Sequence, residues 1–159
     1  MVRRMKRFSF AIFLIIFFTI LFRPIPILEV YSFPHRALLL RNRLPKTGVF
    51  QLQYTHSWDK TPVWDIFKIN KFGNLILDRE EYLWMGAGLE SHLEADMDFS
   101  GERVSIRHNK NIKEFQLAVG TVANHQLMVE NNEIPLDNLV EAGRKVIIKT
   151  KLLPRLIFY

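Results

Sequence analysis

The sequence contains no cysteine, which excludes disulfide bonds, thiolate metal sites, a cysteine nucleophile and a lipidated cysteine. A domain of this kind must hold together by packing. The sequence also has no Walker phosphate loop, no Gly-x-Ser-x-Gly nucleophile elbow and no His-Glu-x-x-His metal motif. Because no nucleophile, base and orienting group come together in any one motif, we expect a protein that is not an enzyme and uses no cofactor.

The positive charge of the chain is confined to one end. The formal net charge is +6, but residues 1–46 carry nine Lys or Arg against one Glu, a net of +8. The remaining residues carry 13 Lys or Arg against 15 Asp or Glu, a net of −2. A nucleic-acid-binding domain requires a basic patch. The slightly acidic larger part of the chain therefore argues against a nucleic-acid partner.

An uncharged, largely apolar run, Phe8–Phe22, follows the basic N-terminal residues MVRRMKR. As a helix it would span roughly 22 Å, against a hydrocarbon core about 30 Å thick. Two interpretations stay open, a retained transmembrane anchor and a cleaved signal peptide. The bulky side chains and the missing small-residue cleavage site favour the anchor, with the lipid bilayer as a partner. The preceding positive charges predict a single-pass protein of the cell membrane with a cytoplasmic N-terminus.

The remaining chain divides at its prolines. Residues 1–23 form the predicted anchor or signal segment, and residues 24–36, with Pro24, Pro26 and Pro34, are expected to be an extended spacer. Residues 37–159 are predicted to form an extracytoplasmic domain.

Period-two alternation of apolar and polar residues predominates in this domain. Many short strands with turn signals at close spacing predict an all-β fold, an antiparallel β-sandwich or barrel-like domain after one N-terminal transmembrane helix. Asn109–Asn111 is expected to be a turn, and Leu136–Glu141 a single helical turn. The predicted strands are Ala37–Arg43, Val49–His56, Val63–Asn70, Leu75–Asp78, Tyr82–Met85, Arg103–Arg107, Glu114–Ala118, Gln126–Val129 and Lys145–Lys151.

The stretch YTHSWDKTPVWD, residues 54–65, has the densest set of chemically capable side chains. Alternation places His56 on the same face as Phe50 and Leu52, and Asp65 on the same face as Phe67. In a hairpin these two inward polar groups would come within reach of each other. They could form a tie that fixes the hairpin register, or a polar pocket that binds an anionic or polar ligand.

The pocket interpretation draws in further residues. His125 enters a later strand and could approach His56 across a sandwich. Adjacent strand side chains diverge, so His56 and Ser57 are not a catalytic dyad. The predicted ligand-binding or structural cluster comprises His56, Ser57, Lys60, Asp65 and His125, with no catalytic residue assigned.

Two other segments resemble binding motifs in part. Asp96–Gly101 imitates the start of an EF-hand loop, but Arg107 stands where the closing glutamate is required, so a solvated acidic loop is the expectation. The alternating His92, Glu94, Asp96 and Asp98 give weak support for a metal, and no metal site is predicted. Gly86-Ala87-Gly88 lacks the third glycine of a dinucleotide loop and suggests a bend.

Three segments together resemble a bacterial family of unknown function, domain-of-unknown-function family 1850. They are Tyr54–Val63 with Asp65 following, Gly86–Leu89 and Val119–Leu127, and the resemblance covers most of residues 38–150. Departures include Trp58 in place of a smaller aliphatic residue, Asp59 and Asp65 where glutamate is frequent, and Glu90 where proline is common. Members are typically encoded beside TRAP transporters of the TAXI type, so the resemblance implies an exported or anchored domain near a solute transporter.

Three functions follow as expectations. The first is an accessory role for a TRAP-type solute transport system, with the transporter subunits as partners. The second is a small-ligand-binding module that uses the His/Asp pocket. The third and least favoured is a hydrolase or metal-dependent enzyme.

Overall fold

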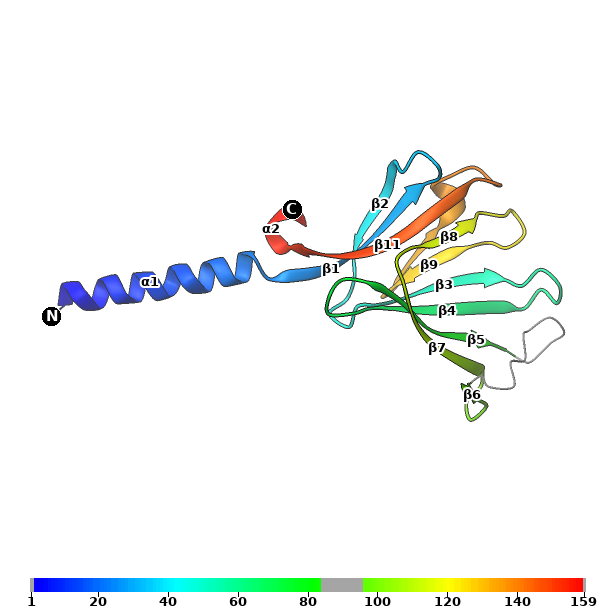
Figure 1. Ribbon diagram of the computed structural model, residues 1–159, viewed down its shortest axis with the longest axis horizontal. Coiled ribbons are helices and arrows are strands. Elements are labelled where there is room, and N and C mark those ends of the chain that lie inside the picture. Colours follow the sequence, from blue (N-terminus) through cyan, green and yellow to red (C-terminus); the bar gives the residue numbers. More distant parts are fainter. Residues whose placement is uncertain (1, 84–95, 159) are drawn as a thin grey trace.

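The computed structural model describes residues 2–83 and 96–158, and it contains two antiparallel β-sheets packed face to face. The four-stranded sheet has the order β2-β1-β11-β8, and the seven-stranded sheet has the order β10-β9-β3-β4-β5-β7-β6. The two sheets diverge with distance from the N-terminal helix (Figure 1). The predicted all-β antiparallel sandwich is therefore confirmed.

The elements have the following bounds. The four-stranded sheet contains β2 (Leu38–Arg43), β1 (Pro24–Ser32), β11 (Lys145–Pro154) and β8 (Phe115–Ala118). The seven-stranded sheet contains β10 (Asn132–Pro135), β9 (Gln126–Val129), β3 (Val49–Thr55), β4 (Pro62–Ile69), β5 (Leu75–Tyr82), β7 (Val104–Ile112) and β6 (Asp96–Asp98). The helical elements are α1 (Val2–Leu21), the 3-10 turn η1 (Leu136–Asn138) and α2 (Arg155–Phe158).

The core lies between the sheets and is built from the alternating residues that the sequence pattern indicated. The rings of Phe50 on β3 and Phe67 on β4 stack with centroids 5.1 Å apart. From the other sheet, Leu28 and Val30 on β1 and Ile148 on β11 are fully buried in the same cluster. Side chains of one parity thus close the interior, as expected for a sandwich with one buried face per sheet.

The predicted spacer over residues 24–36 is wrong, because Pro24–Ser32 forms β1, an interior strand between β2 and β11. Its prolines are tolerated for a geometric reason. The Pro26 carbonyl accepts a hydrogen bond from the Leu44 N–H on the β2 side, and the ladder with β2 begins only at Ile27. The missing proline N–H therefore lies on the β2 side, at the end of that ladder, and takes no donor from the ladder with β11.

Two smaller expectations also need correction. The pattern predicts Leu75–Asp78 and Tyr82–Met85 as separate strands, but Leu75–Tyr82 is one strand with a register shift between Leu77 and Arg79. Residues 84 and 85 of the second predicted strand lie outside the described residues. The predicted turn Asn109–Asn111 lies inside β7, where Asn109 has a φ of 46° opposite that shift. A bulge bends the strand there without ending it.

Helix α1 occupies Val2–Leu21 and projects away from the sandwich (Figure 1). Only two residues separate its end from the start of β1. Within residues 2–83 and 96–158, no helix combines the length and the apolar character needed to cross a membrane.

Candidate functional site

The β3–β4 hairpin places Asp65 on the inner face of the seven-stranded sheet, as alternation predicted. The register sets Phe50 opposite Phe67, Leu52 opposite Asp65, and Tyr54 opposite Val63. Directly opposed residues of an antiparallel pair share a face. Asp65 is only 4% exposed, so a carboxyl group is buried among core side chains.

The predicted contact between His56 and Asp65 does not form. His56 lies beyond the end of β3, and its N–H donates to the Thr61 carbonyl at 2.8 Å. Its Nδ1 lies 3.0 Å from Asp59 Oδ1. Because Asp65 is opposite Leu52, His56 is four positions further along the strand direction, roughly 13 Å at ~3.3 Å per residue. The strand register thus keeps the two side chains apart, although the alternation pattern assigns both to the same face of the sheet.

The YTHSWDKTPV motif is a hairpin turn that hydrogen-bonds to itself. Asp59 Oδ1 accepts hydrogen bonds from the Thr61 N–H at 3.1 Å and the Thr61 hydroxyl at 2.8 Å. The Thr61 backbone hydrogen bond is the main reason that the pKa of Asp59 is lowered. Lys60 has a φ of 61°, and its Nζ donates to the Ser57 carbonyl at 2.6 Å. Ser57, Lys60 and His56 therefore belong to the turn, as Asx-type turn chemistry allows.

The neighbour of Asp65 is a second acidic residue. Across the β4–β5 ladder, Asp65 is directly opposite Glu80. Burial, and secondarily the charge of Glu80, raise the pKa of Asp65 to about 7. Asp65 Oδ1 has no hydrogen-bond partner among the residues described. A buried acceptor without a donor is costly, so this oxygen calls for an explanation.

Glu80, in contrast, has its own partners. The Tyr82 hydroxyl donates to Glu80 Oε2 at 2.6 Å, and His108 Nε2 lies 3.2 Å from the same oxygen. Burial, reinforced by the bond to Glu80, raises the pKa of Tyr82, and burial likewise raises the pKa of Tyr54. We call this set the inner carboxylate cluster: Tyr54, Asp65, Glu80, Tyr82 and His108.

His125 reaches the edge of the cluster through an aromatic contact. Its ring centroid lies 5.7 Å from that of Tyr54. Its Nδ1 accepts a hydrogen bond from the Gly120 N–H at 3.5 Å, which ties it to the β8–β9 connection. Burial lowers the pKa of His125, which favours the neutral ring. Of the five residues predicted as a cluster, Asp65 and His125 therefore lie at or beside the inner carboxylate cluster, and the other three do not.

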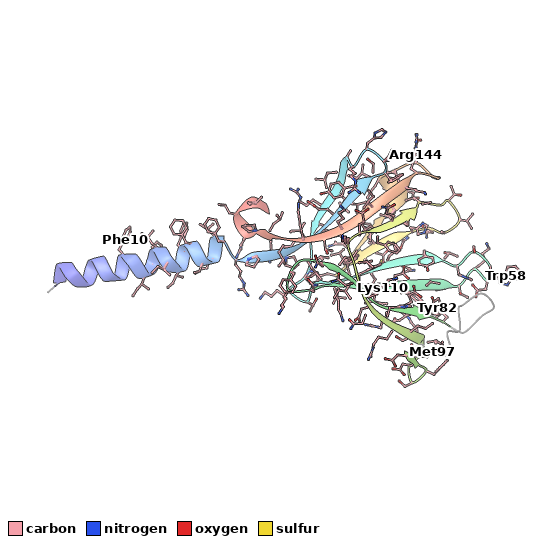
Figure 2. All side chains as sticks on the ribbon, viewed as in Figure 1. Phe10, Trp58, Tyr82, Met97, Lys110 and Arg144 are labelled. Carbon is pink, nitrogen blue, oxygen red and sulfur yellow. The ribbon has the colours of Figure 1, made fainter. Side chains whose placement is uncertain are left out.

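Sequence reasoning missed Glu80, Tyr82 and His108. The bulge at Asp78–Arg79 resets the alternation of β5, so parity counted from Leu75 gives the wrong face for Glu80. His108 lies in the matching irregularity of β7. Only the hairpin register reveals that Asp65 and Glu80 are neighbours. Apolar Val63, Ile106 and Met97 pack beside Tyr82 and Tyr54, and Figure 2 shows Tyr82 and Met97 toward the end of the sandwich remote from α1.

A second buried carboxylate of the chain, in contrast to Asp65, is fully supplied with hydrogen-bond donors. Glu29 on β1 is 2% exposed. It accepts hydrogen bonds from Arg41 at 2.7 Å and Tyr31 at 2.6 Å, and Lys151 Nζ lies 2.8 Å away. Burial alone would raise the pKa of Glu29, but these donors, with Lys151 foremost, lower it overall. Asp65 lacks any comparable donor in the part of the chain that the structure describes.

The acidic segment adds no metal centre within the described ranges, where no group of three or more potential ligands is found. Asp96 and Asp98 belong to β6, and Asp98 Oδ1 accepts a hydrogen bond from the Ser100 N–H at 2.9 Å. His92, Glu94 and Gly86–Leu89 lie outside the described residues.

Fold and site together define a class: an antiparallel two-sheet sandwich with a buried carboxylate on its inner face, one oxygen of which has no hydrogen-bond partner among the described residues. The chain belongs to the family described as domain of unknown function (DUF1850), whose model matches residues 50–136, more than half of the chain. The match spans the seven-stranded sheet and β8 and ends at the first residue of η1, and it includes every member of the inner carboxylate cluster. No curated protein and no solved structure matches the chain.

Proposed function

We propose that the domain is a small-ligand-binding module, not an enzyme, and that it binds a protonated amine at the inner carboxylate cluster. The observation that carries the proposal is the buried Asp65 Oδ1, which has no hydrogen-bond partner among the described residues. A buried polar group is normally paired. A ligand N–H⁺ would supply the missing donor.

The surroundings of Asp65 favour a cationic ligand over an anionic one. Glu80 adds a second carboxylate on the adjacent strand. A cation between them would offset the desolvation and repulsion that raise the pKa of Asp65. The rings of Tyr54 and Tyr82 add electron-rich faces of the kind that attract ammonium groups. Tyr54, Glu80 and His125 are each half-buried, so the cluster is reachable from the edge of the sandwich.

Thermal unfolding of the full chain in a neutral detergent tests the proposal. The probes are putrescine and choline at pH 8, with acetate as the matched anion. A saturating amine at about 100 times its Kd should raise Tm by roughly 5–10 °C. Asp65→Asn should abolish the rise. Asp78→Asn, on a side chain paired with Lys68 and Arg79, should retain it.

The pH dependence provides a second readout. Amine binding requires ionised Asp65, so a proton and the amine compete. The apparent affinity should fall about tenfold per pH unit below about 7. The absence of any amine-dependent rise at pH 8, with Asp65→Asn more stable than the natural chain, would mean that Asp65 is only a strained structural carboxyl group.

We also propose that α1 attaches the domain to the cell membrane by inserting its apolar side chains into the lipid layer. Support comes from the basic residues that precede the apolar run and from the exposure of its side chains on every side of the helix. A helix that is apolar all round is unlike the surface helix of a globular protein. Large exposed side chains occur at Phe10, Ile12, Phe13, Leu14, Ile15, Ile16, Phe17, Phe18 and Ile20.

For such an anchored module we propose an accessory role in a TRAP-type solute transport system. Family membership supports this role, through the transporter-linked setting that the resemblance implies. The test is co-purification of transporter subunits with the tagged full chain from detergent-solubilised membranes. Recovery of the intact chain without those subunits would oppose the accessory role and leave amine binding to be judged separately.

A further inference from the structure

The two ends of the folded domain leave the sandwich at one point. Strand β1 begins beside the end of β11, with Pro24 opposite Pro154. The Arg155 N–H then donates to the Arg23 carbonyl at 3.1 Å. Helix α1 therefore enters the sheet where α2 leaves it, and Figure 1 shows α2 beside the end of α1.

Helix α2 contacts the last turns of α1. Phe17, Ile20 and Leu21 of α1 line an apolar depression together with Leu156 and Arg155 of α2. The outward side of this junction is also apolar, because Phe22, Leu156 and Ile157 are 54%, 53% and 59% exposed. The C-terminal residues thus continue the exposed apolar surface of α1 onto a second element.

We propose that α2 is a second membrane contact, in which Leu156 and Ile157 enter the same lipid layer as the last turn of α1. This inference rests on the membrane attachment proposed for α1. Contact between the two helices holds α2 at the depth of that turn. Arg23 and Arg155, joined by a backbone hydrogen bond, lie at one level, where their guanidinium groups can pair with anionic lipid headgroups.

Lipid fits this surface better than a protein partner does. Consecutive helical residues point about 100° apart, so the exposed run from Ile12 to Phe18 covers every side of α1. A partner protein would cover one side, whereas lipid surrounds a helix. The basic residues Arg23 and Arg155 at the sheet end of the helix match the headgroup layer in sign.

Two attachment points would fix the orientation of the sandwich. Because only two residues separate α1 from β1, the sheet cannot swing freely on a linker. The β3–β4 turn, with Trp58 at its tip, lies at the end remote from α1 (Figure 2). The edge nearest the inner carboxylate cluster would then face away from the bilayer.

The absence of cysteine makes the test clean, since a single introduced cysteine is the sole labelling site. The variants are Ile157→Cys on α2, Phe13→Cys on α1 and Val122→Cys, a 65% exposed position in the β8–β9 connection. Each full chain carries an environment-sensitive nitrobenzoxadiazole label. The chains are reconstituted in vesicles of three parts phosphatidylcholine to one part phosphatidylglycerol, with and without doxyl-labelled lipid.

Doxyl lipid should quench the labels at positions 13 and 157 several-fold more than the label at position 122. Quenching at 13 without quenching at 157 would overturn the role of α2 while leaving the α1 attachment intact. A blue-shifted but unquenched label at 157 would indicate a contact between copies of the chain and would also overturn it. Quenching at neither position would contradict the attachment of α1 itself.

Discussion

Asp65 and Glu29 show that burial alone does not set the behaviour of a carboxyl group. Both are nearly inaccessible to solvent. Glu29 is surrounded by Arg41, Lys151 and Tyr31, which lower its pKa against the effect of burial. Asp65 is beside another acid, so burial and Glu80 together raise its pKa to about 7. The presence or absence of hydrogen-bond donors in contact with the carboxylate decides whether its pKa is lowered or raised.

This difference predicts a pH-dependent stability gap between the natural chain and Asp65→Asn. A raised folded-state pKa means that the folded chain binds the proton more tightly than the unfolded chain. The stabilisation of the folded chain by the protonated Asp65 carboxyl is complete below about pH 4 and is lost as pH rises to about 7. The gap should grow by roughly 3–4 kcal/mol across that window, with Asp65→Asn the more stable at pH 8. Urea unfolding at several pH values measures it.

Asp78→Asn is the matched control for that measurement. Hydrogen bonds from Lys68 and Arg79 outweigh burial and lower the pKa of Asp78. Its stabilising effect is therefore present at neutral pH and lost on acidification, which is the opposite sign. A pH-independent gap for Asp65→Asn would show that the Asp65 carboxyl titrates normally.

At the scale of elements, the short connections carry much of the strand register. Gly48, in the turn between β2 and β3, has a φ of 68°, and its carbonyl accepts a hydrogen bond from the Ile69 N–H at 3.0 Å. A Cβ at this position would overlap Cγ2 of Ile69. Gly143 has a similar φ of 85°, but a Cβ there meets nothing within 4 Å. A comparison of alanine substitutions at these two glycines therefore distinguishes the cost of backbone strain from the cost of steric overlap.

Gly48→Ala should therefore destabilise the chain more than Gly143→Ala. The positive φ should cost about 1 kcal/mol at either position, and the overlap with Ile69 should add about 1–3 kcal/mol at Gly48 alone. Urea unfolding supplies both values. In the Ile69→Ala background, which lacks the overlapping methyl group, Gly48→Ala should cost only the backbone contribution, about as much as Gly143→Ala. Equal losses for the two alanine variants would show that Ile69 yields without penalty.

At the scale of the whole molecule, the N-terminal segment completes the fold. The family match at residues 50–136 contains the seven-stranded sheet, whereas β1, β2 and β11 of the opposite sheet lie outside it. Strand β1 contributes the fully buried Ile27, Leu28 and Val30 to the molecule. The sandwich is therefore closed by segments that flank the matched region on both sides.

The position of β1 predicts how truncations behave. A fragment of residues 23–159 retains β1 and should unfold cooperatively. A fragment of residues 38–159 loses three fully buried apolar side chains, each worth about 1.5–3 kcal/mol, from a total stability of about 5–15 kcal/mol. We expect it not to fold, as measured by circular dichroism and urea titration. Cooperative unfolding of the shorter fragment would make β1 dispensable.

Local pattern accounts for much of the fold and for little of the site. The alternation in Val49–Thr55 and Pro62–Ile69 correctly places Phe50, Phe67 and Asp65 inside. It fails where a bulge shifts parity, which hides Glu80. It also gives no register, and so it pairs His56 with the wrong aspartate.

The sequence by itself determined the strand-rich class of the domain, the inward direction of Asp65 and the charged, apolar character of the N-terminus, because each depends on neighbours within a few residues. Only the tertiary structure decided that β1 is an interior strand, that Asp65 is opposite Glu80, and that α2 lies against α1. These depend on which distant segments share a ladder or a contact, and the free energy of burying side chains across the whole core selects that arrangement.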